Sequence, residues 1–183
     1  MTAFRIIIVF LAMVLSPGLA RAESAITKGI ANAYYKNCIS RDDQRMSDSA
    51  QSALCSCSAA QMIEKMSIEE VFRMKKELGP GRIEYDKMLT EVYGPCMEVP
   101  VEETLYNECM NDSKVEQFYL RDKNKLCRCT SQKSARYLAD NGVNVMTYLL
   151  KDAPAMEDPM DYILNDGRFR QQAYNNLYVC FKQ

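Results

Sequence analysis

The chain has 183 residues, with 23 basic and 24 acidic side chains, eight cysteines and no histidine. Proteins that bind nucleic acid carry clustered Lys and Arg, so this interspersed, nearly neutral charge argues against such a partner. Catalytic triads that use a histidine are excluded, and there is no Gly-rich phosphate loop. We therefore expect a protein that is not an enzyme and that carries neither a cofactor nor a metal.

Residues 1–22 have the pattern of a signal peptide for export. Arg5 supplies a positive start, residues 6–15 are apolar, and Ala20 and Ala22 are the small residues that precede a cleavage site. The apolar run is shorter than the ~20 residues that a membrane-spanning helix needs, which disfavours the alternative of an uncleaved anchor. The sequence predicts cleavage before Glu23, a periplasmic or secreted location, and no stable membrane insertion of the mature chain.

Residues 23–97 form the first predicted unit, in which apolar residues recur at the spacing of helix faces. Asp48 with Gln51 supplies a cap for the helix that contains Cys57, and Ser67 with Glu70 forms a stronger capping box for the next. We expect this next helix to stop at the Gly-Pro-Gly sequence 79–81, because proline forbids continuation. The expected helices are 26–38, one from residue 48, one from residue 68, and 83–93, which ends at Gly94-Pro95.

Residues 98–183 form the second predicted unit, with a short proline-containing linker at 97–100 between the two. Asn141-Gly142 has the composition of a left-handed helix cap, so a helix should end there. No segment alternates apolar and polar residues between turns, so no sheet is needed. The expected helices are 101–110, 120–140, 143–151 and 168–181.

The two units repeat one cysteine pattern, C…CxC…C, which uses all eight cysteines. In a helix, residues i and i+2 point ~200° apart, so the two cysteines of a CxC can bond to two different neighbours but not easily to each other. An even cysteine number in an exported chain favours disulfides. We therefore predict an all-α fold of two tandem disulfide-stapled units of about four helices each, related by an internal repeat. The cysteines are Cys38, Cys55, Cys57 and Cys96 in the first unit, and Cys109, Cys127, Cys129 and Cys180 in the second.

Within a helical hairpin, the cysteines nearest the turn should pair with each other. This rule favours Cys38 with Cys55 and leaves Cys57 for Cys96. The swapped assignment differs by about half a helical turn and stays open. By repetition, the second unit should pair Cys109 with Cys127 and Cys129 with Cys180.

Two other chemistries compete for the CxC pairs. Zinc sites use wider C-x2-C to C-x4-C spacing, whereas copper(I) would suit thiolates together with the many methionines. Redox catalysis usually needs C-x-x-C at a helix start, and Arg128 between the second pair has Ser56 as its counterpart in the first. The leading interpretation is an exported non-catalytic protein-interaction or structural module. The alternatives are a periplasmic thiol–disulfide or copper-handling protein, and a small periplasmic chaperone.

The largest difference between the units is residues 152–166, a longer segment with two prolines and several acidic residues. Exposed apolar residues among charges are typical of a partner-binding loop. The alternative is that these side chains cover the adjoining helix ends. The partner would be another protein, and the candidate binding residues are Met156, Met160, Tyr162 and Leu164.

Overall fold

The computed structural model describes residues 23–41, 43–76, 83–118, 122–154 and 156–183. The predicted signal peptide and the Gly-Pro-Gly stop lie outside these ranges. Within them the chain is helical, with a single β-bridge between Ala25 and Ser67. The all-α fold class is therefore confirmed. The helices are α2 (Lys28–Ile39), α3 (Asp48–Lys65), α4 (Ile68–Lys76), α5 (Ile83–Lys87), the π-helix η1 (Met88–Tyr93), the 3₁₀ turn η2 (Gly94–Cys96), α6 (Glu98–Asn111), α7 (Ser113–Phe118), α8 (Lys123–Asp152), α9 (Pro159–Asn165) and α10 (Gly167–Phe181).

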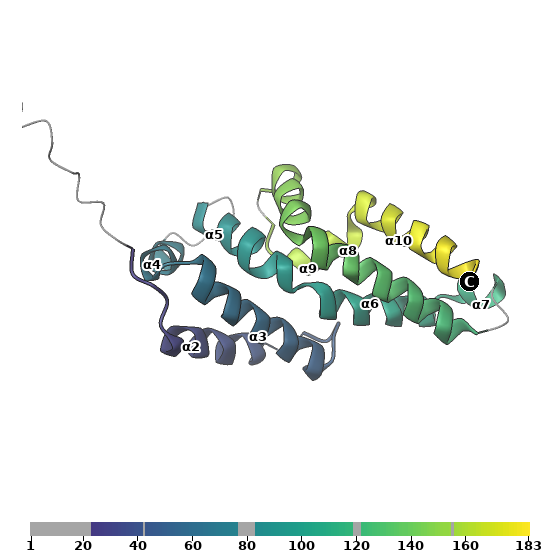
Figure 1. Ribbon diagram of the computed structural model, residues 1–183, viewed down its shortest axis with the longest axis horizontal. Coiled ribbons are helices and arrows are strands. Elements are labelled where there is room, and N and C mark those ends of the chain that lie inside the picture. Colours follow the sequence, from purple (N-terminus) through teal and green to yellow (C-terminus); the bar gives the residue numbers. More distant parts are fainter. Residues whose placement is uncertain (1–22, 42, 77–82, 119–121, 155) are drawn as a thin grey trace, which may run out of the picture.

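Each helix that carries a CxC packs between two neighbours. Helix α3 contacts α2 and η1, and α8 contacts α6 and α10. Figure 1 shows α2 to α5 towards one end of the molecule, and α7, α10 and the C-terminus at the other. Helix α6 joins these groups because it contacts both α3 and α8.

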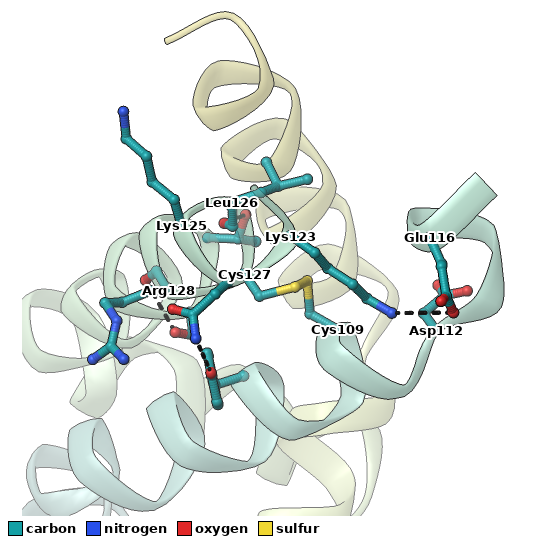
Figure 2. The surroundings of a disulfide bond; sticks show 12 residues. Cys109, Asp112, Glu116, Lys123, Lys125, Leu126, Cys127 and Arg128 are labelled. Atoms are coloured by element: carbon teal, nitrogen blue, oxygen red, sulfur yellow. Dashed lines mark hydrogen bonds and ion pairs between the residues drawn. A yellow bond between two sulfur atoms is a disulfide. The ribbon is translucent and has the colours of Figure 1, made fainter. Parts of the chain in front are cut away.

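The disulfides follow this packing, and all of the predicted pairings are present. Helix α3 is bonded through Cys55 to α2 and through Cys57 to η2. Helix α8 is bonded in the same way to α6 and to α10, and Figure 2 shows the α6–α8 bond beside Lys123, which reaches Glu116 of α7. The swapped pairing does not occur. The bonds are Cys38–Cys55, Cys57–Cys96, Cys109–Cys127 and Cys129–Cys180.

The largest group of buried apolar side chains takes residues from both halves of the chain. It includes Leu54 and Leu89 from the first half and Leu138 and Phe169 from the second. Met97 is also fully buried in it, and α6 begins one residue later. The prediction of a linker at residues 97–100 is therefore wrong, because a proline in the first turn of a helix does not interrupt it.

The prediction that a helix ends at Asn141-Gly142 is also wrong. Helix α8 continues through both residues to Asp152, and in Figure 1 its C-terminal part turns away from the direction of its first part. A Cβ atom on Gly142 would overlap the carbonyl group of Gly94, lying 2.7 Å from its carbon atom. Gly142 therefore allows two backbones to come into contact, which is a different use of glycine from a cap.

Side-chain caps begin several of the helices, and the cap of α4 was predicted correctly. Ser67 and Glu70 form the capping box, with the Glu70 N–H donating to Ser67 Oγ at 3.1 Å and the Ser67 N–H donating to Glu70 Oε2 at 2.8 Å. Helix α3 is capped by Ser47 instead of Asp48. Helices α7 and α9 were not predicted, and α9 starts at Pro159 with Asp158 as its cap.

Candidate functional site

A cleft of about 600 Å³ opens in the first half, lined by α2, α3, α4, α5 and η1. The connection between α2 and α3 and residues 157–159 complete its edge. Two other cavities in the described part of the chain measure about 290 and 120 Å³. Pockets that bind ligands usually occupy ~300–1,000 Å³ and are mostly apolar, so this cleft is the candidate site.

The cleft has a rigid apolar wall. The Cys38–Cys55 disulfide lies in it, beside the buried side chains of Leu54 and Leu89. Because this disulfide bonds α2 to α3, it fixes the spacing of two of the helices that line the cleft. Tyrosines and methionines make up much of the remaining surface: Tyr34, Tyr85, Tyr93, Met46, Met74 and Met88.

The tyrosines keep their protons at neutral pH. Burial raises the pKa of Tyr93, and the negative charges of Asp158 and Asp43 raise it further. Burial also raises the pKa of Tyr34 and Tyr85. Each phenol therefore presents an apolar ring together with a hydroxyl that can donate a hydrogen bond, as the Tyr85 hydroxyl does to the Met156 carbonyl at 3.1 Å.

Arg45 connects the two segments at the edge of the cleft. Its guanidinium contacts Asp43 Oδ2 at 2.5 Å and Asp158 Oδ2 at 2.8 Å. The first carboxylate lies just after α2 and the second just before α9, so this ion triad ties the segment that precedes α9 to the first half. Together with the Tyr85 hydrogen bond, it fixes the edge formed by residues 157–159.

The ion triad predicts a pH dependence. The hydrogen bond from Arg45 holds the pKa of Asp43 below its ordinary value. The Asp43–Arg45 pair therefore contributes its full stabilisation above about pH 3.9, the pKa of an aspartate in the unfolded chain. This contribution is lost as the pH falls through the lower pKa that Asp43 has in the folded protein. We expect the Asp43→Asn variant to lose less stability than the parent protein between neutral and strongly acidic pH, as measured by urea unfolding.

The exposed Asp140 of α8 supplies the control Asp140→Asn, which should behave like the parent. Equal acid sensitivity of the parent and Asp43→Asn would contradict the prediction.

The candidate partner-binding loop is placed differently from the prediction. Met156, Met160 and Leu164 are buried in the main core, and only Tyr162 is exposed, at 39%. The expectation that all four side chains are offered at the surface is therefore wrong. Apolar residues of a short segment against α8 and α10 gain more by leaving water than by facing it. The segment contributes instead to the cleft, through residues 157–159.

Sequence reasoning did not find the cleft itself. Its lining comes from separate stretches between Tyr34 and Pro159, and no short motif joins them. The available signal was the recurrence of Tyr85, Leu89 and Tyr93 at four-residue spacing, which also describes an ordinary buried helix face.

All eight cysteines are in disulfides. A thiolate for copper binding or for thiol exchange would therefore require prior reduction of one of these bonds. Within the described ranges, no three or more Cys, Asp or Glu side chains are grouped so that they could hold a metal ion.

Comparisons with family models, curated proteins and solved structures found no match to this chain. None of the described helices is long and apolar enough to cross a membrane. The function is therefore inferred from the cleft and from the disulfide-bonded scaffold around it.

Proposed function

We propose that this protein is an exported, non-catalytic interaction module that binds another protein through the cleft of its first half. The observation that carries the proposal is the open cleft of about 600 Å³, whose lining includes three tyrosines and three methionines. Tyrosine supplies a large contact area with little conformational freedom to lose, and methionine adapts to irregular apolar surfaces. Such a surface suits recognition better than it suits catalysis.

The scaffold is proposed to be a duplicated unit, 23–97 and 98–183, built for an oxidising compartment after removal of residues 1–22. The order of bonds supports this, because each CxC helix is bonded first to the helix before it and then to the last helix of its half. Halves of this size bury a limited core, and disulfides commonly supply the missing stability. A rigid scaffold also reduces the entropy lost when a partner binds.

The alternatives receive less support from the same features. A thiol–disulfide or copper-handling protein would need reduced cysteines, whereas all eight are paired. A small chaperone would use an apolar cleft as well, but it would have to open further to hold unfolded chains. The Cys38–Cys55 and Cys57–Cys96 bonds oppose that opening.

Site-specific photo-crosslinking in the producing cells tests the proposal. The photoreactive residue p-benzoylphenylalanine in place of Tyr34 would lie in the cleft. The matched control replaces Tyr178, a tyrosine of α10 that is 61% exposed and lies outside the cleft. We expect a discrete protein adduct from position 34 and none from position 178.

Adducts from both positions, or from neither, would contradict the proposal. The same purified protein tests the compartment: its first residue should be Glu23, and its intact mass should be lower than the reduced mass by eight hydrogens. Retention of Met1, or titratable thiols, would contradict export into an oxidising compartment.

A further inference from the structure

The segment that precedes α2 is fixed against the start of α4. The Ile68 N–H donates to the Ser24 carbonyl oxygen at 2.8 Å. The next residue, Ala25, forms the β-bridge to Ser67. The side chain of Ile26 is 5% exposed and packs in a second, smaller group of buried apolar residues. Figure 1 shows the chain passing α4 before it enters α2, so this segment has a defined position on the first half.

One carboxylate of α4 binds this segment through both of its oxygen atoms. Glu69 Oε2 accepts from the Ser24 N–H at 2.8 Å, and Glu69 Oε1 accepts from the Ser24 hydroxyl at 2.9 Å. The backbone nitrogen atoms of adjacent residues are at most about 3.7 Å apart in any conformation. The nitrogen of Glu23 therefore lies within about 6.5 Å of Glu69 Oε2. Two opposite charges at this separation still attract each other, even in water.

The described charged side chains around this segment form a network with more carboxylates than cations. Arg73 of α4 contacts the carboxylate of Glu23 at 3.4 Å and that of Glu84 at 2.5 Å. Lys28 of α2 and Lys65 of α3 are exposed and form no ion pair with the described carboxylates. The network comprises Glu23, Glu69, Glu70, Glu84, Arg73 and Lys87. A positive charge on the Glu23 nitrogen would therefore reduce an excess of negative charge.

We infer that the amino group of the mature chain binds Glu69, so that removal of residues 1–22 adds an ion pair to the first half. The inference rests on the proposed export and specifies what processing does to the fold. A peptidase that hydrolyses the bond between Ala22 and Glu23 adds one water molecule. The Ala22 carbonyl group becomes a carboxylate, and the Glu23 nitrogen becomes an ammonium group. Before cleavage this nitrogen belongs to a neutral amide, so the positive charge exists only in the processed chain.

The first test measures how tightly the terminal amino group holds its proton. The oxidised protein is produced behind a removable leader that leaves Glu23 as the first residue. NMR then follows the ¹³Cα signal of Glu23 from neutral to alkaline pH. We expect the proton to be held at least about threefold more tightly than by an ordinary amino terminus, whose pKa is about 7.7–8.0. Glu69→Gln should lose most of this gain, because it removes the nearby negative charge.

A glutamate at the other end of the molecule supplies the matched control. Glu116 of α7 also pairs with a cation, Lys123, at 3.7 Å. Glu116→Gln should leave the proton affinity of the amino group unchanged. The β-bridge of Ala25 and the burial of Ile26 do not involve Glu69, so the segment should stay in place in Glu69→Gln. Far-UV circular dichroism verifies that both variants are folded.

The same contact predicts a stability that depends on pH. Because the folded state holds the proton more tightly, the ammonium group contributes fully below the unfolded pKa of about 7.7–8.0. This contribution is lost as the pH rises through the higher pKa of the folded state. A form with one extra alanine before Glu23 moves the charge away from Glu69. The form that begins at Glu23 should therefore unfold at higher urea at neutral pH, and this advantage should disappear at alkaline pH.

An ordinary proton affinity of the amino group in the folded protein would overturn the inference. So would an equal affinity in Glu69→Gln and the parent, or a natural first residue other than Glu23. If Glu23 is the natural first residue and either of the first two results is found, the exported interaction module stands. Only the binding of the amino terminus by Glu69 is then removed.

Discussion

Replacement of Gly142 by alanine is expected to lower the free energy of unfolding by about 3 kcal/mol, at the upper end of the usual range for overpacked sites. The added Cβ would overlap the carbonyl oxygen of Gly94 and lie 2.7 Å from the carbonyl carbon of the same residue. Both are backbone atoms, so no side chain can rotate away. Cys96 lies two residues after Gly94 and is bonded to Cys57. This disulfide limits how far the Gly94 backbone can move away from the added Cβ atom.

Glycine-to-alanine changes elsewhere in the chain provide the control. A Cβ atom on Gly167 would meet no other atom within 4 Å, and one on Gly29 would meet only Thr27 Oγ1 at 3.7 Å. Alanine is a better helix former than glycine by up to ~1 kcal/mol, so Gly29→Ala and Gly167→Ala should be neutral or stabilising. Urea unfolding followed by circular dichroism at 222 nm measures all three variants. A cost for Gly142→Ala below that of a typical surface change would show that the two backbones are not in contact.

Removal of the Cys129–Cys180 bond is expected to cost more stability than removal of Cys109–Cys127. The bonds close loops with sequence separations of 51 and 18 residues. In the chain-entropy model these loops correspond to ~4 and ~3 kcal/mol, because the longer loop restricts the unfolded chain more. Changing both cysteines of a bond to alanine avoids a free thiol that could exchange with the other bonds.

Denaturant unfolding of the two double variants measures this difference. Each should remain folded at low denaturant, with the larger loss of stability in Cys129→Ala/Cys180→Ala. Cys127 is fully buried, whereas Cys129 is only partly buried. A reversed order would therefore mean that loss of packing around Cys127 outweighs the loop-closure term.

The sequence by itself was sufficient for the all-α class, for most of the helices and for the use of the cysteines in disulfides, with the observed pairing favoured over its swapped alternative. They depend on local geometry: apolar residues at helical spacing predict helix faces, and the ~200° between residues i and i+2 sends the two cysteines of a CxC to different neighbours. The Ser67–Glu70 capping box is local in the same sense. The absence of histidine likewise excludes histidine-based catalytic triads without any structure.

Only the tertiary structure decided what glycine, proline and the apolar residues of the connections do. Asn141-Gly142 has the composition of a helix end, but Gly142 lies inside α8 because the Gly94 backbone passes against it. A short segment that contains a proline is typical of a linker, yet Pro100 lies in the first turn of α6 and is buried. The cleft is assembled from stretches between Tyr34 and Pro159, and Leu164 is buried in the main core instead of facing a partner. These outcomes depend on contacts between residues far apart in the chain, and a local pattern carries no information about which distant surface will meet it.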